Sequence, residues 1–144
     1  MDVFKNISTK ENKMLLKFPA YISLIAANSD NILDDAEEKL AIELAHIKTF
    51  SCDPLLAEFY TEAYKVFKDN LERLNKSLPK EKNNREATIK KELSNLENIV
   101  LKLGEDYTSA MHRSMKSFTE HVSRAQRPCK FYFSYTNTRI NRLK

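Results

Sequence analysis

Glycine and proline are scarce in this chain of 144 residues, which contains one glycine, Gly104, and four prolines. Proteins built from β-sheet need such residues at their many turns, so this shortage predicts an all-α fold. A single glycine also excludes the glycine-rich loops that cradle phosphates and the Gly-x-Ser-x-Gly turn of many hydrolases. The sequence therefore argues against the common nucleotide-binding and hydrolase classes, though not against every enzyme.

Cysteines and long apolar runs are scarce as well. Cys52 and Cys129 are too few for a disulfide framework and have no Cys-x-x-Cys partner. We therefore expect a reduced, cytoplasmic compartment, with a single bridge as the alternative. Apolar runs stay well short of about 18 residues, so no membrane span is expected. Residues 1–17 lack the pattern of a signal peptide. The length predicts a single domain over residues 1–144.

The net charge of +4 is distributed unevenly, because residues 127–144 carry a charge of +5 and residues 1–126 about −1. This basic tail contains four aromatic rings within five positions, and its candidate anion contacts are Arg127, Lys130, Arg139 and Arg142. Proteins that bind single-stranded nucleic acid combine rings that stack on bases with cations that follow phosphates. The favoured interpretation is a segment whose rings pack on the bundle while its charged groups reach water, because charge confined to a tail is weak evidence for nucleic acid.

Apolar residues at helical spacing predict a compact bundle of about five helices, followed by an irregular aromatic tail. The expected elements are a helix over 10–28 with a kink or break at Pro19, a second over 35–49, a third over 54–77, an exposed connector over 79–84, and a helical pattern from 85 to about 127 that is either continuous or broken at Gly104. The third helix and the start of the last pattern are expected to pair antiparallel. The stripe from Ile89 to Val122 closes within the chain or pairs with a second copy.

An acidic joint over residues 28–38, the elbow, separates the first two predicted helices. Asp34 is predicted to cap the second helix through its carboxylate, and Glu37 stands where a capping box needs its acid. Asp35 and Glu38 add negative charge at the positive end of the helix dipole. Leu33 is predicted to point into the core.

The elbow is also a candidate cation site, because hard cations such as calcium prefer several oxygen ligands. Five carboxylates fall within nine residues: Asp30, Asp34, Asp35, Glu37 and Glu38. The spacing differs from the EF-hand loop, which needs Asp or Asn where Ile32 stands and glycine where Asp35 stands. Helix capping with a solvated acidic face is the favoured interpretation. Capping leaves Asp30, Asp35 and Glu38 as the candidates for a cation.

Histidines offer few candidate ligands. Glu43 and His46 form a Glu-x-x-His pair, but di-iron bundles use that pair twice and add further glutamates. A half-buried His46 bonded to a neighbour is the favoured interpretation. His112 and His121 are nine residues apart, whereas a two-histidine zinc site on one helix needs a spacing of four, so neither is predicted to be a ligand.

The elbow resembles the tellurite-resistance B-like (TerB-like) family, which carries a pattern close to Ala-Asp-Gly-x-Ile-x-x-x-Glu between two helices of an all-α domain. Asp30 matches the family's aspartate, Leu33 its apolar residue, and Glu37 falls near its acidic position. Asn31 replaces the glycine, and the second acidic junction of many members is absent. The resemblance covers about residues 15–50. It implies a helical bundle, an association with stress responses and an acidic surface suggested to bind metal.

These features predict a non-enzymatic, TerB-like helical domain that binds a cation such as calcium, or a protein partner, at the elbow. One alternative is a nucleic-acid or anion-binding module that uses the basic tail. Another is a metal-dependent enzyme that uses His46 and the acidic residues. A protein partner is expected, a homodimer stays open, and nucleic acid is the less favoured ligand.

Overall fold

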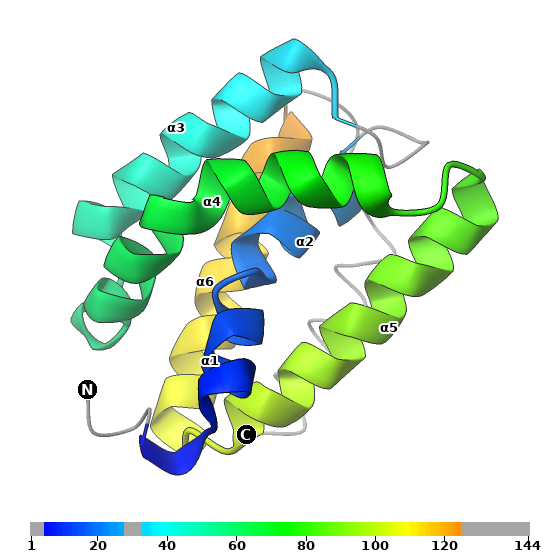
Figure 1. Cartoon of the computed structure of the whole chain (residues 1–144). Coiled ribbons are helices and arrows are strands. Elements are labelled where there is room, and N and C mark those ends of the chain that lie inside the picture. Colours follow the sequence, from blue (N-terminus) through cyan, green and yellow to red (C-terminus); the bar gives the residue numbers. More distant parts are fainter. Residues whose placement is uncertain (1–4, 28–32, 125–144) are drawn as a thin grey trace.

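The computed structural model describes residues 5–27 and 33–124. Within these ranges the main elements are six α-helices and the 3-10 helix between α3 and α4 (Figure 1): α1 (Thr9–Leu15), α2 (Phe18–Ile25), α3 (Asp35–Ser51), η2 (Pro54–Leu56), α4 (Ala57–Ser77), α5 (Lys82–Leu101) and α6 (Glu105–Arg124). No strand occurs in the described ranges. The predicted all-α bundle is confirmed. The basic aromatic tail lies outside the described residues.

Helix α2 lies at the centre of the bundle and contacts α4, α5 and α6. Every residue of α2 is buried, because neighbours cover it on all sides. The predicted break in the first helix falls at Leu16 and Lys17, and Pro19 sits in the first turn of α2, where its missing N–H is tolerated. Ser23 satisfies its buried hydroxyl by donating to the carbonyl of Pro19 at 2.9 Å.

The expected antiparallel pairing of the third helix with the following one is wrong, and α3 and α4 form the antiparallel hairpin instead (Figure 1). Helix α5 turns away from α4 and packs on α2 and α1. Arg85, in the first turn of α5, is fully buried at this corner. Its guanidinium donates to Asn75 Oδ1 at 2.6 Å and to the Pro79 carbonyl at 3.4 Å. A buried charge held in this way fixes the corner between α4 and α5.

The long C-terminal pattern is broken at Gly104, which was one of the two alternatives. Gly104 has a φ of +101°, a conformation that side-chain-bearing residues rarely adopt. Thr108 donates its hydroxyl to the carbonyls of Val100 and Gly104, so the end of α5 is tied to the start of α6. The chain therefore reverses here in an exposed turn in which Leu103 is buried.

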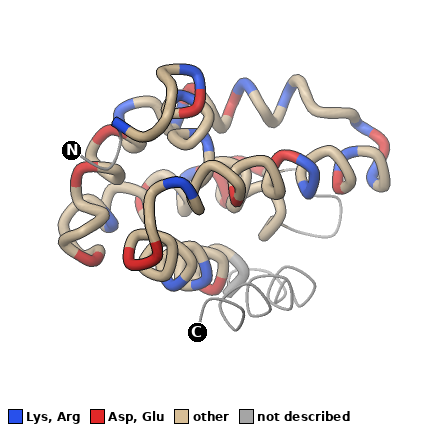
Figure 2. Tube along the Cα trace, turned by 90° about the horizontal axis from the view of Figure 1, so that it is seen from below, with Lys and Arg blue, Asp and Glu red and all other residues tan. Residues whose placement is uncertain are grey.

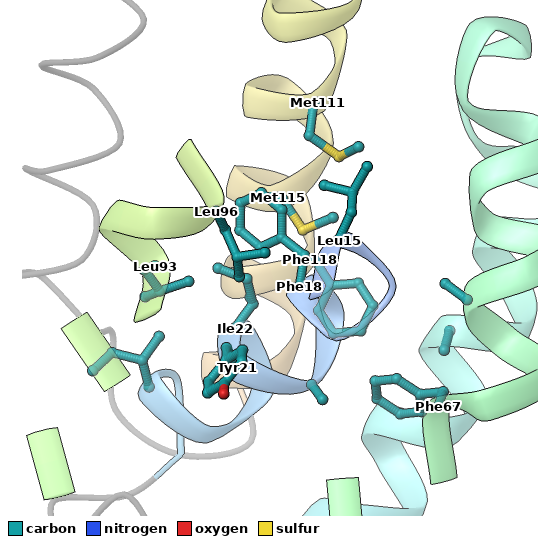
Figure 3. Packing of buried hydrophobic residues seen from close by; sticks show 14 of the residues in the cluster. Leu15, Phe18, Tyr21, Ile22, Phe67, Leu93, Leu96, Met111, Met115 and Phe118 are labelled. Atoms are coloured by element: carbon teal, nitrogen blue, oxygen red, sulfur yellow. The ribbon is translucent and has the colours of Figure 1, made fainter. Parts of the chain in front are cut away.

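The core is continuous and lies between α2 and its neighbours (Figure 3). Phe18 and Ile22 of α2 meet Met115 and Phe118 of α6, while Phe67 enters from α4. The stripe predicted from Ile89 to Val122 is buried inside the chain, so it is not the exposed surface that pairing with a second copy would need. No helix in the described ranges is long and apolar enough to cross a membrane.

Candidate functional site

The N-terminal end of α3 has the predicted capping geometry. The Asp34 carboxylate accepts a hydrogen bond from the Glu37 N–H at 2.8 Å, and Glu37 accepts one from the Asp34 N–H at 3.0 Å. This reciprocal pair is a capping box with aspartate at the cap. Glu37 is 2% exposed and Leu33 is buried as predicted. Two of the five candidate metal ligands therefore have a structural role.

The remaining described carboxylates of the elbow do not converge on a cation site. Burial, a hydrogen bond with Glu72 of α4 and the charge of that neighbour raise the pKa of Glu38, with Asp35 adding to the rise. Within residues 5–27 and 33–124, no group of three or more His, Cys, Asp or Glu side chains has the arrangement to hold a metal ion. Asp30 lies outside the described residues. Its part in a cation site stays a prediction.

A buried positive charge lies behind the elbow. Arg85 donates to Asn75, and the same Asn75 amide bonds the backbone of Leu33, with Nδ2 donating to the Leu33 carbonyl at 3.4 Å. The Asn75 side chain thus links the Arg85 guanidinium to Leu33, the residue that precedes the Asp34 cap. Arg85 and Asn75 therefore belong to the hydrogen-bond network that holds the backbone just before α3.

The other predicted ligands are either dispersed or outside the described part. Arg127, Lys130, Arg139 and Arg142 fall in residues 125–144, which are not described. Glu43 and His46 are both exposed, so the expected half-buried histidine bonded to a neighbour is not found. Figure 2 shows Lys and Arg lying among Asp and Glu along the described helices. The described helices, with charges of both signs interspersed, therefore offer no extended basic track for phosphates.

An exposed group of rings occupies the C-terminal half of α3. The α3 aromatic patch consists of His46, Ile47 and Phe50 of α3 with Tyr64 of α4. His46 stacks on Tyr64 with a centroid distance of 5.1 Å, and Phe50 meets His46 edge-on at 5.8 Å. Phe50 is 72% exposed, Ile47 45% and Tyr64 37%. This patch was not predicted, because His46 was considered only as a metal ligand or as a half-buried histidine bonded to a neighbour. The four-residue step from His46 to Phe50 nevertheless indicates one helical face.

A buried polar pair joins α5 to α6. His112 Nε2 lies 2.6 and 2.8 Å from the two carboxylate oxygens of Glu97, and both residues are 3% exposed. His112 Nδ1 is buried and has no hydrogen-bond partner in the described part of the chain. This role of His112 could not be predicted from histidine spacing along one helix, because its partner is a carboxylate on the neighbouring helix.

A polar seam connects the C-terminal end of α3 and the start of α4 to α6. Lys48 donates to Ser117 at 3.1 Å, and the Tyr60 hydroxyl lies 2.5 Å from that of Ser114. Cys52 is a free thiol at the end of α3. Burial raises the pKa of Tyr60, while the hydrogen bond with Ser114 opposes that rise. The seam thus contains the Lys48 amine, the Cys52 thiol and the hydroxyls of Tyr60, Ser114 and Ser117. No motif in the sequence predicts it.

The geometry thus divides α3 into a capped acidic end and an aromatic end beside a nucleophilic seam. The resemblance of residues 15–50 to the TerB-like family stays a prediction. No family model, curated protein or solved structure matches this chain.

Proposed function

We propose that this chain is a non-enzymatic helical domain that acts by binding a protein, and that the partner is a second copy docked on the α3 aromatic patch. The observation that carries the proposal is the exposure of Phe50 in a ring cluster on a domain whose other large side chains are mostly buried. Contiguous exposed apolar surface on a soluble domain marks an interaction site. Aromatic residues are also enriched in the cores of protein interfaces.

The chemistry of the patch suits a copy of itself. Docking by a two-fold axis places the same surface on both sides, so the surface must complement itself. Rings supply faces and edges that pair with other rings, and His46 and Tyr64 add polar groups at the margin. Charges of both signs lie exposed on the same two helices, with Lys39 and Glu43 on α3 and the ion pair of Glu62 and Lys65 on α4. A partner with a strong net charge of one sign would find no complementary charge on this surface.

The elbow has a structural role in this proposal. Among its described carboxylates, Asp34 and Glu37 form the capping box and Glu38 lies beside Glu72, and no observation favours a cation. A setting in stress responses is what the TerB-like resemblance implies, and the cytoplasm is the compartment expected from the cysteine content. Neither expectation changes the docking surface.

Light scattering on size-exclusion fractions of the whole chain tests the proposal. The intact chain should elute as a dimer that dissociates on dilution, and Phe50→Ser should elute as a monomer. Leu101→Ser is the matched control, because Leu101 is also an exposed apolar residue, at 43%, but lies at the end of α5. A monomer at all concentrations of the intact chain would contradict the proposal. So would equal loss of dimer in both variants.

A further inference from the structure

Two nucleophilic side chains lie close together at the C-terminal end of α3, on the side that packs against α6. Lys48 is in the last turn of α3, and Cys52 caps the helix, donating its backbone N–H to the Lys48 carbonyl at 3.3 Å. Residues four apart on a helix lie on the same face, so this backbone hydrogen bond places the two side chains as neighbours on one turn. Both side chains are half-buried, which leaves each accessible to a small reagent.

The environment of Lys48 favours a reactive amine. Its Nζ donates to the Ser117 hydroxyl, a neutral group that does not stabilise an ammonium as a carboxylate does. Burial lowers the pKa of Lys48, with the neighbouring Cys52 opposing that change. More of the neutral amine is therefore present than at an exposed lysine, and the neutral amine is the nucleophile. Lys65 is the natural comparison, because it is exposed and held 2.6 Å from the Glu62 carboxylate.

The thiol has the complementary property. Burial raises the pKa of Cys52, and the positive charge of Lys48 works against that rise. The thiol is therefore mostly protonated and needs a base before it can attack. The neutral amine of Lys48 is the neighbouring group that can accept its proton.

We propose that Lys48 is a site of N-acylation, and that Cys52 first accepts the acyl group from an acyl thioester and then passes it to Lys48. In the first step the Cys52 sulfur attacks the thioester carbonyl. A new sulfur–acyl bond forms, the original one breaks, and the leaving thiolate takes up the proton released by Cys52. In the second step the neutral Lys48 amine attacks the Cys52 thioester. An amide forms, the bond to Cys52 breaks, and the proton lost by nitrogen returns to the Cys52 sulfur.

The second step gains from proximity, since a group held beside its acceptor reacts as if at very high concentration. Acylation removes the positive charge of Lys48 but leaves one N–H, so the hydrogen bond to Ser117 can persist without the charge. The modification would therefore alter the electrostatics of the seam between α3 and α6 while keeping its packing.

Peptide mass spectrometry of the whole chain treated with acetyl-coenzyme A tests the inference, using Cys129→Ser so that Cys52 is the only thiol. Lys48 should be acetylated at least about tenfold faster than Lys65, and Cys52→Ser should remove most of that difference. Equal rates at Lys48 and Lys65 in the chain that retains Cys52 would overturn the inference. An undiminished Lys48 rate in Cys52→Ser would do the same.

A second variant decides the question even where Cys52→Ser folds poorly. Lys48→Arg blocks the second step and keeps the positive charge beside Ser117. The acetyl group should then remain on Cys52 as a thioester that hydroxylamine removes. Absence of any hydroxylamine-sensitive adduct on Cys52 in this variant would overturn the inference. Both outcomes are independent of whether the chain forms a dimer.

Discussion

The two ends of α3 use their side chains for opposite purposes. At the N-terminal end, Asp34 and Glu37 satisfy backbone N–H groups that the helix cannot satisfy itself. At the C-terminal end, Phe50 extends into solvent, and the rings of His46 and Tyr64 stack beside it. The acidic end therefore stabilises the fold of the monomer. We expect the aromatic end to add little to that fold, because its rings lie largely in water, and we propose that a partner docks there.

The comparison teaches that conspicuous carboxylates need not be functional ones. A side chain with a structural role reveals itself when its removal lowers the free energy of unfolding. A side chain reserved for binding changes association and leaves unfolding nearly unchanged. Substitutions of both kinds of residue can be ranked by their expected effect on the free energy of unfolding, from the largest to the smallest.

Glu97→Ala should have the largest effect, because it leaves His112 buried without its partner. Breaking a buried pair by removing one member costs about 3–5 kcal/mol of unfolding free energy. Urea denaturation measures the change. The double variant Glu97→Leu with His112→Leu is the control and should recover much of the loss, since it removes both polar groups. A Glu97→Ala chain as stable as the parent would show that the pair does not hold α5 against α6.

Asp34→Ala should come next, with a loss of about 1 kcal/mol for the missing helix cap. Asp35→Ala is the matched control, because Asp35 lies in the same first turn but accepts no capping bond in the structure. Its loss should stay within the few tenths of a kcal/mol typical of a charge near a helix dipole. Equal losses in the two variants would mean that general acidity, rather than the capping box, stabilises this end of α3.

Glu38→Gln should change the pH dependence of stability more than stability itself. The pKa of Glu38 is raised above its ordinary value of 4.5, so the folded state favours the protonated carboxyl. That contribution is fully present below 4.5 and is lost as the pH rises through the raised pKa of the folded state. Relative to the parent, Glu38→Gln should therefore gain stability between acid and neutral pH.

Urea denaturation at several pH values measures the difference between Glu38→Gln and its parent. Glu43→Gln provides the control, since Glu43 is an exposed carboxylate of the same helix. A constant difference between Glu38→Gln and the parent across this range would show that burial and the neighbouring Glu72 do not raise the pKa of Glu38 in solution.

Phe50→Ser should have the smallest effect on unfolding of the monomer, within about 0.5 kcal/mol, because the side chain is mostly in water already. Denaturation at high dilution, where a dimer has dissociated, isolates the monomer. Phe67→Ser, a fully buried ring of α4, is the contrasting substitution and should destabilise strongly. A large loss in Phe50→Ser at high dilution would place this ring among the structural residues.

The helices, the start of α3 and the buried stripes were predictable because each depends on local spacing. Asp34, Glu37 and Leu33 have roles that follow from their order in the chain. Contacts between distant segments were not predictable in the same way. Glu97 meets His112 only because the chain reverses at Gly104. Likewise, the corner at Arg85 directs α5 away from α4, so the expected helix pairing was wrong.

The candidate functional site shows the same difference between local features, which were predictable, and contacts between distant segments, which were not. The capping box of the elbow was predictable, because four consecutive positions specify it. The α3 aromatic patch was not, because periodicity cannot say which apolar residues a neighbouring helix will cover. Phe50 and Ile47 look like core residues by type, and only the position of α4 and α6 leaves them exposed. The seam around Lys48 and Ser117 depends on the same packing.

The central claim is that the N-terminal end of α3 stabilises the fold and its C-terminal end binds a partner. Sedimentation equilibrium of the intact chain, Asp34→Ala and Phe50→Ser tests this claim most directly. Association weakens when the residue at the centre of an interface is truncated, typically by about 1–2 kcal/mol or more. We predict a dimer for the intact chain, a nearly unchanged dissociation constant for Asp34→Ala and a dissociation constant at least about tenfold higher for Phe50→Ser. A dissociation constant that responds to Asp34→Ala and not to Phe50→Ser would contradict the account.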